Sequence, residues 1–202
     1  MIHDDYLDRT TSMTGEISET LFKDIQQASA GYWFHPKFKE EKVLTFDEFI
    51  DFVNASQLNV NIELKGITGN HGPKLAKSLI KQLVEAMPKF SPEVEILFSS
   101  FNIPLLKAVQ EALPQYPRAV LYEMCAFYED WRTVLDFCDT HILHLEDIDL
   151  TEALVRRIKY DGYILNVYTV NDVDRVNQLF NFGVDGVFTD YPQNLVHLQE
   201  SL

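Results

Sequence analysis

Residues 163–190 read YILNVYTVNDVDRVNQLFNFGVDGVFTD, and this stretch contains a complete strand–helix–strand pattern. Its first apolar run predicts a buried strand, and the periodic apolar residues at 171–183 predict a helix. Asn171 is placed to cap the start of this helix, and Gly183 is placed to end it. The last apolar run, VDGVFTD, predicts a second strand. A strand, a helix and a strand in this order indicate a parallel βαβ unit.

The same alternation runs through most of the chain. Strands are predicted at 58–65, 94–101, 118–122, 140–145, 163–170 and 184–190, with helical patterns between them and a loop at 69–73. A further helix is predicted ahead of the first strand, because Thr45 and Glu48 have the spacing of a capping box. The α/β class follows from this alternation.

Two α/β architectures fit six such strands, a doubly wound sheet and a (β/α)8 barrel. No GxGxxG follows the first strand, so a dinucleotide-binding fold lacks support. A barrel has eight strands and about 250 residues. A chain of 202 residues with six predicted strands is smaller than a complete barrel.

Composition excludes several kinds of partner. Hydrophobic residues make up 46% of the chain, which is the range of a folded globular protein. The net charge of −14 opposes binding to nucleic acid or to an anionic membrane surface. No apolar run approaches the ~20 residues of a membrane span, so no stable membrane anchor is expected. Cys125 and Cys138 lack metal-site or disulfide patterns, and the expected compartment is the cytoplasm. A leader ahead of Met1 stays an open possibility.

The stretch NVNIELKG at 59–66 carries the first candidate site residues. Side chains alternate between the two faces of a strand, so Asn61, Glu63 and Lys65 share one face. In a barrel the polar face points inward, and active sites gather at the carboxyl ends of the strands. Glu63 and Lys65 are therefore expected at a catalytic mouth. An ion pair that serves stability alone is the alternative.

Two aromatic residues hold similar positions on other predicted strands. Phe101 ends the strand at 94–101, and Tyr168 lies near the end of the strand at 163–170. Both are candidates for contact with a substrate at the mouth of a barrel. For Tyr168, the alternative is an aromatic side chain that only fills the barrel.

The chain opens with a dense polar segment, IHDDYLDRTT, which contains His3, Asp4, Asp5 and Arg9. Together with NVNIELKG, ILFSSF and the long stretch from 163 to 195, this segment resembles the glycerophosphodiester phosphodiesterase family, and in particular its cytoplasmic bacterial enzymes. The resemblance runs along nearly the whole chain. It implies one domain over 1–202, in which residues 4–42 form the small insertion of the family and residues 43–202 form barrel units.

This resemblance implies a TIM-type (β/α)8 barrel that is truncated at its N-terminus, with about six of its eight units. The His-Arg-Gly strand and the Glu-x-Asp strand that open the family have no counterpart here. His3 corresponds to a catalytic histidine and Glu63 to a metal-binding carboxylate. Lys65 corresponds to a catalytic residue that stabilises phosphate, and Tyr168 and Phe101 to residues near the substrate.

The implied reaction is hydrolysis of a glycerophosphodiester to glycerol 3-phosphate and an alcohol, with a divalent cation, Mg²⁺ or Ca²⁺. Two other hypotheses remain open: a non-catalytic relative that acts as a binding protein or is a gene fragment, and a phosphodiesterase of the phosphatidylinositol phospholipase C type. An incomplete barrel also exposes strand edges, so self-association is expected. The alternative for His3 is a frayed terminal residue without catalytic power.

Overall fold

The computed structural model of the protein describes residues 1–67 and 71–196. The chain divides into two compact units. The N-terminal unit is Met1–Val60 with Lys65–Ile96, and the C-terminal unit is Asn61–Leu64 with Leu97–Leu202. The predicted loop at 69–73 lies partly outside the described residues. Within the described part of the chain, no helix has the length and apolar character that a membrane span needs.

Six strands form one sheet in sequential order. They are β1 (Val60–Glu63), β2 (Ile96–Ser100), β3 (Arg118–Tyr122), β4 (Ile142–Glu146), β5 (Ile164–Tyr168) and β6 (Gly186–Val187). The pairs from β2 to β6 are parallel. β1 joins the sheet through bonds such as the one that Leu64 N–H donates to the Ser99 carbonyl at 2.8 Å. The predicted strands and their order are confirmed, with observed ends one to three residues inside most of the expected ranges.

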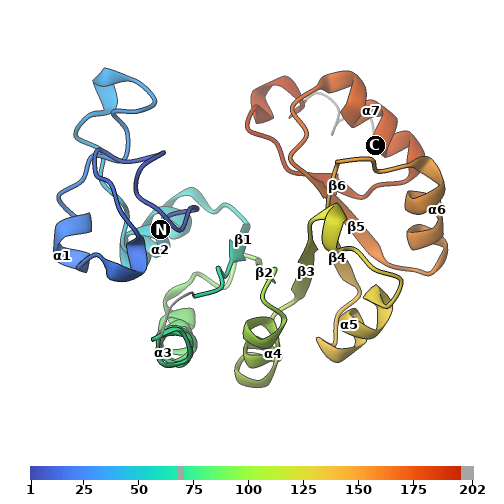
Figure 1. Cartoon of the computed structure of the whole chain (residues 1–202), viewed down its shortest axis with the longest axis horizontal. Helices are drawn as coiled ribbons and strands as arrows, with labels where there is room; N and C mark the ends of the chain where they lie inside the picture. The colour runs from blue at the N-terminus through green and yellow to red at the C-terminus, as the bar shows by residue number, and fades with distance from the viewer. Residues whose placement is uncertain (68–70, 197–202) are drawn as a thin grey trace. The chain divides into compact units, whose positions relative to one another are not determined.

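The helices of the C-terminal unit follow the strands one by one along the sheet (Figure 1). They are α4 (Ile103–Ala112), α5 (Trp131–Phe137), α6 (Glu152–Tyr160) and α7 (Val173–Phe182), with 3-10 turns η4 (Met124–Ala126) and η5 (Pro192–Asn194). Strands in sequential parallel order with a helix after each are the repeating units of a (β/α)8 barrel. This unit curls as part of such a barrel, and the predicted fold class is confirmed.

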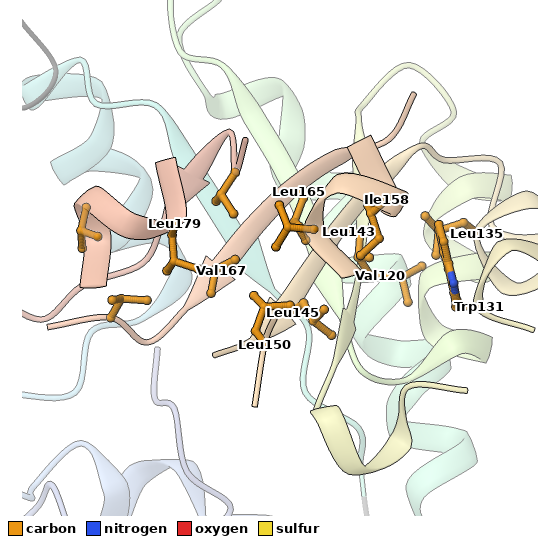
Figure 2. Close-up of a cluster of buried hydrophobic side chains, with 14 of the residues drawn as sticks. Val120, Trp131, Leu135, Leu143, Leu145, Leu150, Ile158, Leu165, Val167 and Leu179 are labelled. Carbon is orange, nitrogen blue, oxygen red and sulfur yellow. The ribbon is translucent and has the colours of Figure 1, made fainter. Parts of the chain in front are cut away.

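One apolar core joins these helices to the sheet (Figure 2). On β4 and β5, Leu143, Leu145, Leu165 and Val167 are fully buried and pack among the helix residues. Because side chains alternate along a strand, the residues between these leucines point to the other face of the sheet. That inner face carries His144 and Glu146 on β4, and it is where barrel enzymes place their chemistry.

The N-terminal unit is built mainly from helices and turns. They are η1 (Ile17–Glu19), α1 (Phe22–Ile25), η2 (Pro36–Phe38), α2 (Phe46–Ser56), α3 (Gly72–Ala86) and η3 (Met87–Lys89). The predicted capping box is present, since the Thr45 hydroxyl accepts from Glu48 N–H and the Glu48 carboxylate accepts from Thr45 N–H. Leu7 is fully buried against Ile25 and Val43, and it anchors the polar opening segment.

The ends of α7 show one prediction that was wrong and one that is confirmed. Gly183 ends the helix with φ of 110°, a left-handed conformation that glycine adopts easily. The residue that caps the start is Asp172, not Asn171, because the Asp172 carboxylate accepts from Arg175 N–H. Asn171 instead accepts hydrogen bonds from Asp190 N–H at 2.9 Å and the Thr189 hydroxyl at 3.0 Å. Its side chain is therefore bonded to the loop that follows β6 and does not cap α7.

Candidate active site

His3 and Lys65 meet in the N-terminal unit. The Nε2 atom of His3 lies 3.3 Å from the Lys65 ammonium nitrogen. On the other side of the ring, Nδ1 of His3 lies 2.8 Å from a carboxylate oxygen of Asp4. A carboxylate accepts hydrogen bonds only, so we assign the ring proton to Nδ1, which leaves Nε2 to accept from Lys65. The ring is therefore oriented from both sides.

Arg9 completes this arrangement. Its Nε and Nη2 atoms donate to the two oxygens of Asp4 at 2.6 and 2.7 Å, a bidentate pair. Hydrogen bonds from Arg9, and then the one from His3, hold the pKa of the Asp4 carboxyl well below its usual range. Asp4 stays ionised at neutral pH and holds His3 in place. Sequence reasoning did not anticipate that Asp4 and Arg9 position His3, although their places in the HDDYLDR segment were a usable signal.

The backbone of the opening segment is tied to the rest of its unit. Leu7 N–H donates to the Gly15 carbonyl at 2.9 Å, and Ile17 N–H donates to the Asp5 carbonyl at 2.9 Å. The buried Thr11 hydroxyl donates to the Leu7 carbonyl at 2.7 Å. These bonds and the burial of Leu7 hold His3 next to an ordered turn, although the His3 side chain itself is 68% exposed.

A second group of predicted residues lies in the C-terminal unit. The rings of Phe101 and Tyr168 meet edge to face, with centroids 6.0 Å apart and an interplanar angle of 88°. The Tyr168 hydroxyl donates to the Tyr122 carbonyl at 2.8 Å. Burial raises the pKa of Tyr168, and the charges of Glu146, Glu123 and Glu63 raise it further. The phenol is therefore neutral at physiological pH and is no candidate for a base.

Glu123 and Glu146 are residues that sequence reasoning missed. Glu146 pairs with Tyr168 in the register of β4 and β5, and its carboxylate accepts from Met124 N–H at 3.0 Å. Glu123 directly follows β3. Their positions at the carboxyl ends of adjacent strands were the available signal, because that edge of a barrel carries the active site.

Glu63 is the predicted metal ligand, at the end of β1 with its Oε1 atom buried. Within residues 1–67 and 71–196, no three His, Cys, Asp or Glu side chains converge on a point that could hold a metal ion. Mg²⁺ and Ca²⁺ bind several oxygen ligands. The described residues therefore do not fit a complete metal site, and Glu63 offers one carboxylate.

His144 lies deeper on the inner face and is fully buried. Its Nε2 lies 3.1 Å from the Asn166 amide, and the Phe188 ring packs against it at 4.9 Å between centroids. Burial lowers the pKa of His144 to about 4. It is neutral at physiological pH, and its surroundings are those of a structural residue.

Sequential parallel strands with polar residues at their carboxyl ends define a (β/α)8-barrel enzyme. Residues 1–194 match the model of the glycerophosphoryl diester phosphodiesterase family, and the chain belongs to this family. The family predicted from the sequence motifs is confirmed.

Individual relatives agree with this assignment. A glycerophosphodiester phosphodiesterase of Caldanaerobacter subterraneus subsp. tengcongensis is 29% identical, over 98% of this chain and 79% of the relative. One from Bacillus subtilis is 30% identical, over 95% of this chain and 69% of the relative. A phosphodiesterase of Oleispira antarctica, solved in complex with the product sn-glycerol-3-phosphate, is 30% identical with a TM-score of 0.89, over 98% of this chain and 78% of that one.

Proposed function

We propose that this protein hydrolyses glycerophosphodiesters to glycerol 3-phosphate and an alcohol. The observation that carries the proposal is the pair of contacts on the His3 ring, with Asp4 at Nδ1 and Lys65 at Nε2. A positioned imidazole suits proton transfer, and a phosphodiester anion is attracted to an ammonium group beside it. The bound product of the Oleispira antarctica relative supports the same substrate class.

The reaction breaks the phosphorus–oxygen bond to the alcohol and forms a new one to the oxygen of water. The water must lose a proton, and the departing alkoxide must gain one. His3 is suited to hold or deliver one of these protons at Nε2, because Asp4 keeps the other ring nitrogen protonated. Lys65 is suited to neutralise charge on the phosphoryl oxygens.

A divalent cation, Mg²⁺ or Ca²⁺, is part of the proposal. When bound, it would supply positive charge to the phosphoryl oxygens. Glu63 is the side chain proposed to contact it, as one carboxylate ligand. With the described residues offering no complete ligand set, we expect weak binding, and no step of the reaction is derived through the cation.

Tyr168 and Phe101 are proposed to contact the substrate through their rings. The Tyr168 hydroxyl already donates to a carbonyl, so its aromatic face is the available surface. Two rings at right angles form an apolar corner that suits the carbon backbone of a glycerol group.

Location and assembly are further parts of the proposal. We place the protein in the cytoplasm, in lipid and glycerol metabolism, on the basis of its cysteine usage and its family. β1 and β6 are the edge strands of the sheet, and edge strands offer backbone groups for pairing with a second copy. Light scattering at low and high protein concentration tests this self-association, and a monodisperse monomer at both would overturn it.

The deciding experiment measures products. The chain is incubated with glycerophosphocholine, glycerophosphoethanolamine or phosphatidylinositol, each with Mg²⁺ or Ca²⁺, and glycerol 3-phosphate is quantified. Release from the first two substrates supports the proposal. Activity on the inositol lipid alone assigns the phospholipase type of reaction instead. Tight substrate binding without release of product assigns a binding protein.

A further inference from the structure

A loop at residues 29–42 of the N-terminal unit, here called the aromatic loop, presents three consecutive aromatic side chains to solvent. Tyr32, Trp33 and Phe34 are 56%, 52% and 69% exposed. In Figure 1 this loop is the light-blue segment that projects from the rest of its unit. Neighbouring apolar side chains that stay exposed are typical of a surface that contacts a protein or a membrane.

The aromatic loop is closed and ordered by its own contacts. Its two ends are joined, because Ala30 N–H donates to the Glu41 carbonyl at 2.8 Å. Gly31 lies so close to the Phe38 carbonyl that any side chain at residue 31 would collide with it. The Trp33 indole N–H donates to the Ala30 carbonyl at 2.9 Å. Because this polar atom is already bonded, moving the indole ring into an apolar medium leaves no unpaired donor.

The charge around the exposed rings is positive. Residues 31–39 read GYWFHPKFK and contain two lysines, one histidine and no acidic residue, in a chain whose net charge is −14. The Lys37 ammonium lies 4.5 Å from the centroid of the Phe38 ring, and the Phe34 and Phe38 centroids are 5.8 Å apart. Charges separated by more than about 8 Å are largely screened at physiological salt. A partner at this loop therefore meets its lysines more than the negative charge of the whole chain.

We propose that the aromatic loop binds reversibly to the surface of an anionic phospholipid bilayer. Aromatic rings favour the boundary between headgroups and acyl chains, and lysines beside them are attracted to anionic headgroups. A second protein chain fits this surface less well, because a specific interface buries about 800 Å² and about 20–30 residues on each partner. The contact is peripheral, adds no membrane-spanning segment and does not depend on the proposed function.

Tryptophan fluorescence tests the contact, because the chain has two tryptophans, Trp33 and Trp131. Trp131 is 1% exposed, so its emission should not respond to lipid. Vesicles of equimolar phosphatidylcholine and phosphatidylglycerol should shift the emission of the unmodified protein to shorter wavelength, because the Trp33 ring leaves water. Trp33→Phe keeps an aromatic ring and should show no shift. Unchanged emission of the unmodified protein overturns the proposal, and so does an equal shift in Trp33→Phe.

Vesicle sedimentation measures what one ring contributes. Phe34→Ala should lower the partition coefficient roughly tenfold, the scale for one phenyl ring that no longer enters an apolar medium. Phe137→Ala is the matched control and should leave partitioning unchanged. Phe137 is 54% exposed, and the Lys107 ammonium lies 5.1 Å from its ring centroid, but it belongs to α5. Equal losses in the two variants overturn the proposal.

A pair of lysine variants tests the preference for anionic lipid. Lys37→Gln should lower partitioning onto the mixed vesicles roughly fivefold, the effect of one lysine near a charged membrane surface. Lys107→Gln also removes a lysine that lies over a phenyl ring and should have no effect. Circular dichroism checks that every variant folds. Binding to pure phosphatidylcholine that equals binding to the mixed vesicles overturns the proposal. A shift of Trp33 emission that appears without lipid as protein concentration rises assigns the loop to a contact between copies instead.

Discussion

The Nε2 atom of His3 lies 3.3 Å from the Lys65 ammonium nitrogen, although the two residues are 62 positions apart in the chain. Through this contact the opening segment lies beside Lys65, which follows β1 and Leu64 in the chain. The contact brings together an imidazole nitrogen and an ammonium group, the two groups that are proposed to act on the phosphate.

The first prediction concerns His3 itself. His3→Ala should lower kcat for glycerophosphocholine by ~10²-fold or more, because a positioned acid or base contributes on that scale. His141→Ala is the matched control, since His141 is exposed and it accepts from Ile164 N–H through its backbone carbonyl, which the substitution keeps. Steady-state kinetics on both variants gives the comparison. Equal activity of His3→Ala and the unmodified protein removes His3 from the site.

The second prediction treats Asp4 as a positioning residue. Asp4→Asn replaces a carboxylate, which can only accept and so keeps the proton on Nδ1 of His3, by an amide that can present its own N–H to that nitrogen instead. We expect kcat to fall by at least ~10-fold, part of the ~10²–10⁴-fold that acid–base catalysis contributes, with KM nearly constant. Proton NMR of the His3 ring should show the altered tautomer. A drop in activity with the tautomer unchanged would point to a merely structural role.

The third prediction separates the two parts of the Tyr168 side chain. Tyr168→Phe removes the hydrogen bond to the Tyr122 carbonyl and should cost about 1 kcal/mol in the free energy of unfolding. KM should stay the same, because the ring is the part proposed to contact substrate. Tyr168→Ala removes the ring and its contact with Phe101 and should raise KM. Urea unfolding and steady-state kinetics on the same two variants decide between these roles.

The fourth prediction concerns Glu63 and the cation. Glu63→Gln should raise the Mg²⁺ or Ca²⁺ concentration needed for half-maximal activity, because an amide binds hard cations less well than a carboxylate. Glu123→Gln is the matched control. Glu123, like Glu63, raises the pKa of Tyr168, so both carboxylates lie close enough to act on the same phenol. Identical metal dependence in Glu63→Gln and Glu123→Gln would contradict the assignment of Glu63 as the metal ligand.

Much of the fold could be predicted because it rests on local patterns. The apolar runs of β3 and β5, the capping box at Thr45 and the turn at Gly183 each depend on a few adjacent residues. Asn171 shows where such reasoning fails. Asn and Asp are equally good caps. In the structure, hydrogen bonds from Thr189 and Asp190 occupy the Asn171 side chain, and its neighbour Asp172 caps the helix.

The candidate site was predictable only in part, because some of its contacts join segments that are far apart in the sequence. Glu63 and Lys65 could be proposed from strand alternation, because both lie in one short segment. The contact between His3 and Lys65, and the orientation of His3 by Asp4, depend on how distant segments pack. Glu146 was missed because its environment depends on the register between β4 and β5. Spacing along one segment carries no information on such pairings.

The fifth prediction concerns His144 and acid stability. Its pKa in the folded protein is lowered to about 4, while an unfolded histidine titrates near its ordinary value of about 6.5. Between these values the unfolded chain binds the proton and the folded protein does not, so protonation favours unfolding. The contribution of His144 is fully present above about pH 6.5 and is lost as pH falls toward about 4.

The loss should reach roughly 2 to 3 kcal/mol when unfolding at about pH 4.5 is compared with unfolding at about pH 7.5. His144→Gln keeps a polar side chain beside Asn166 but cannot take up a proton, so its stability should fall less over the same range. His141→Gln, at an exposed position, should behave like the unmodified protein. Urea titrations at the two pH values give all three differences, and carboxyl groups contribute equally to each. Parallel pH profiles for His144→Gln and the unmodified protein would mean that His144 takes up its proton without unfolding the inner face of the sheet.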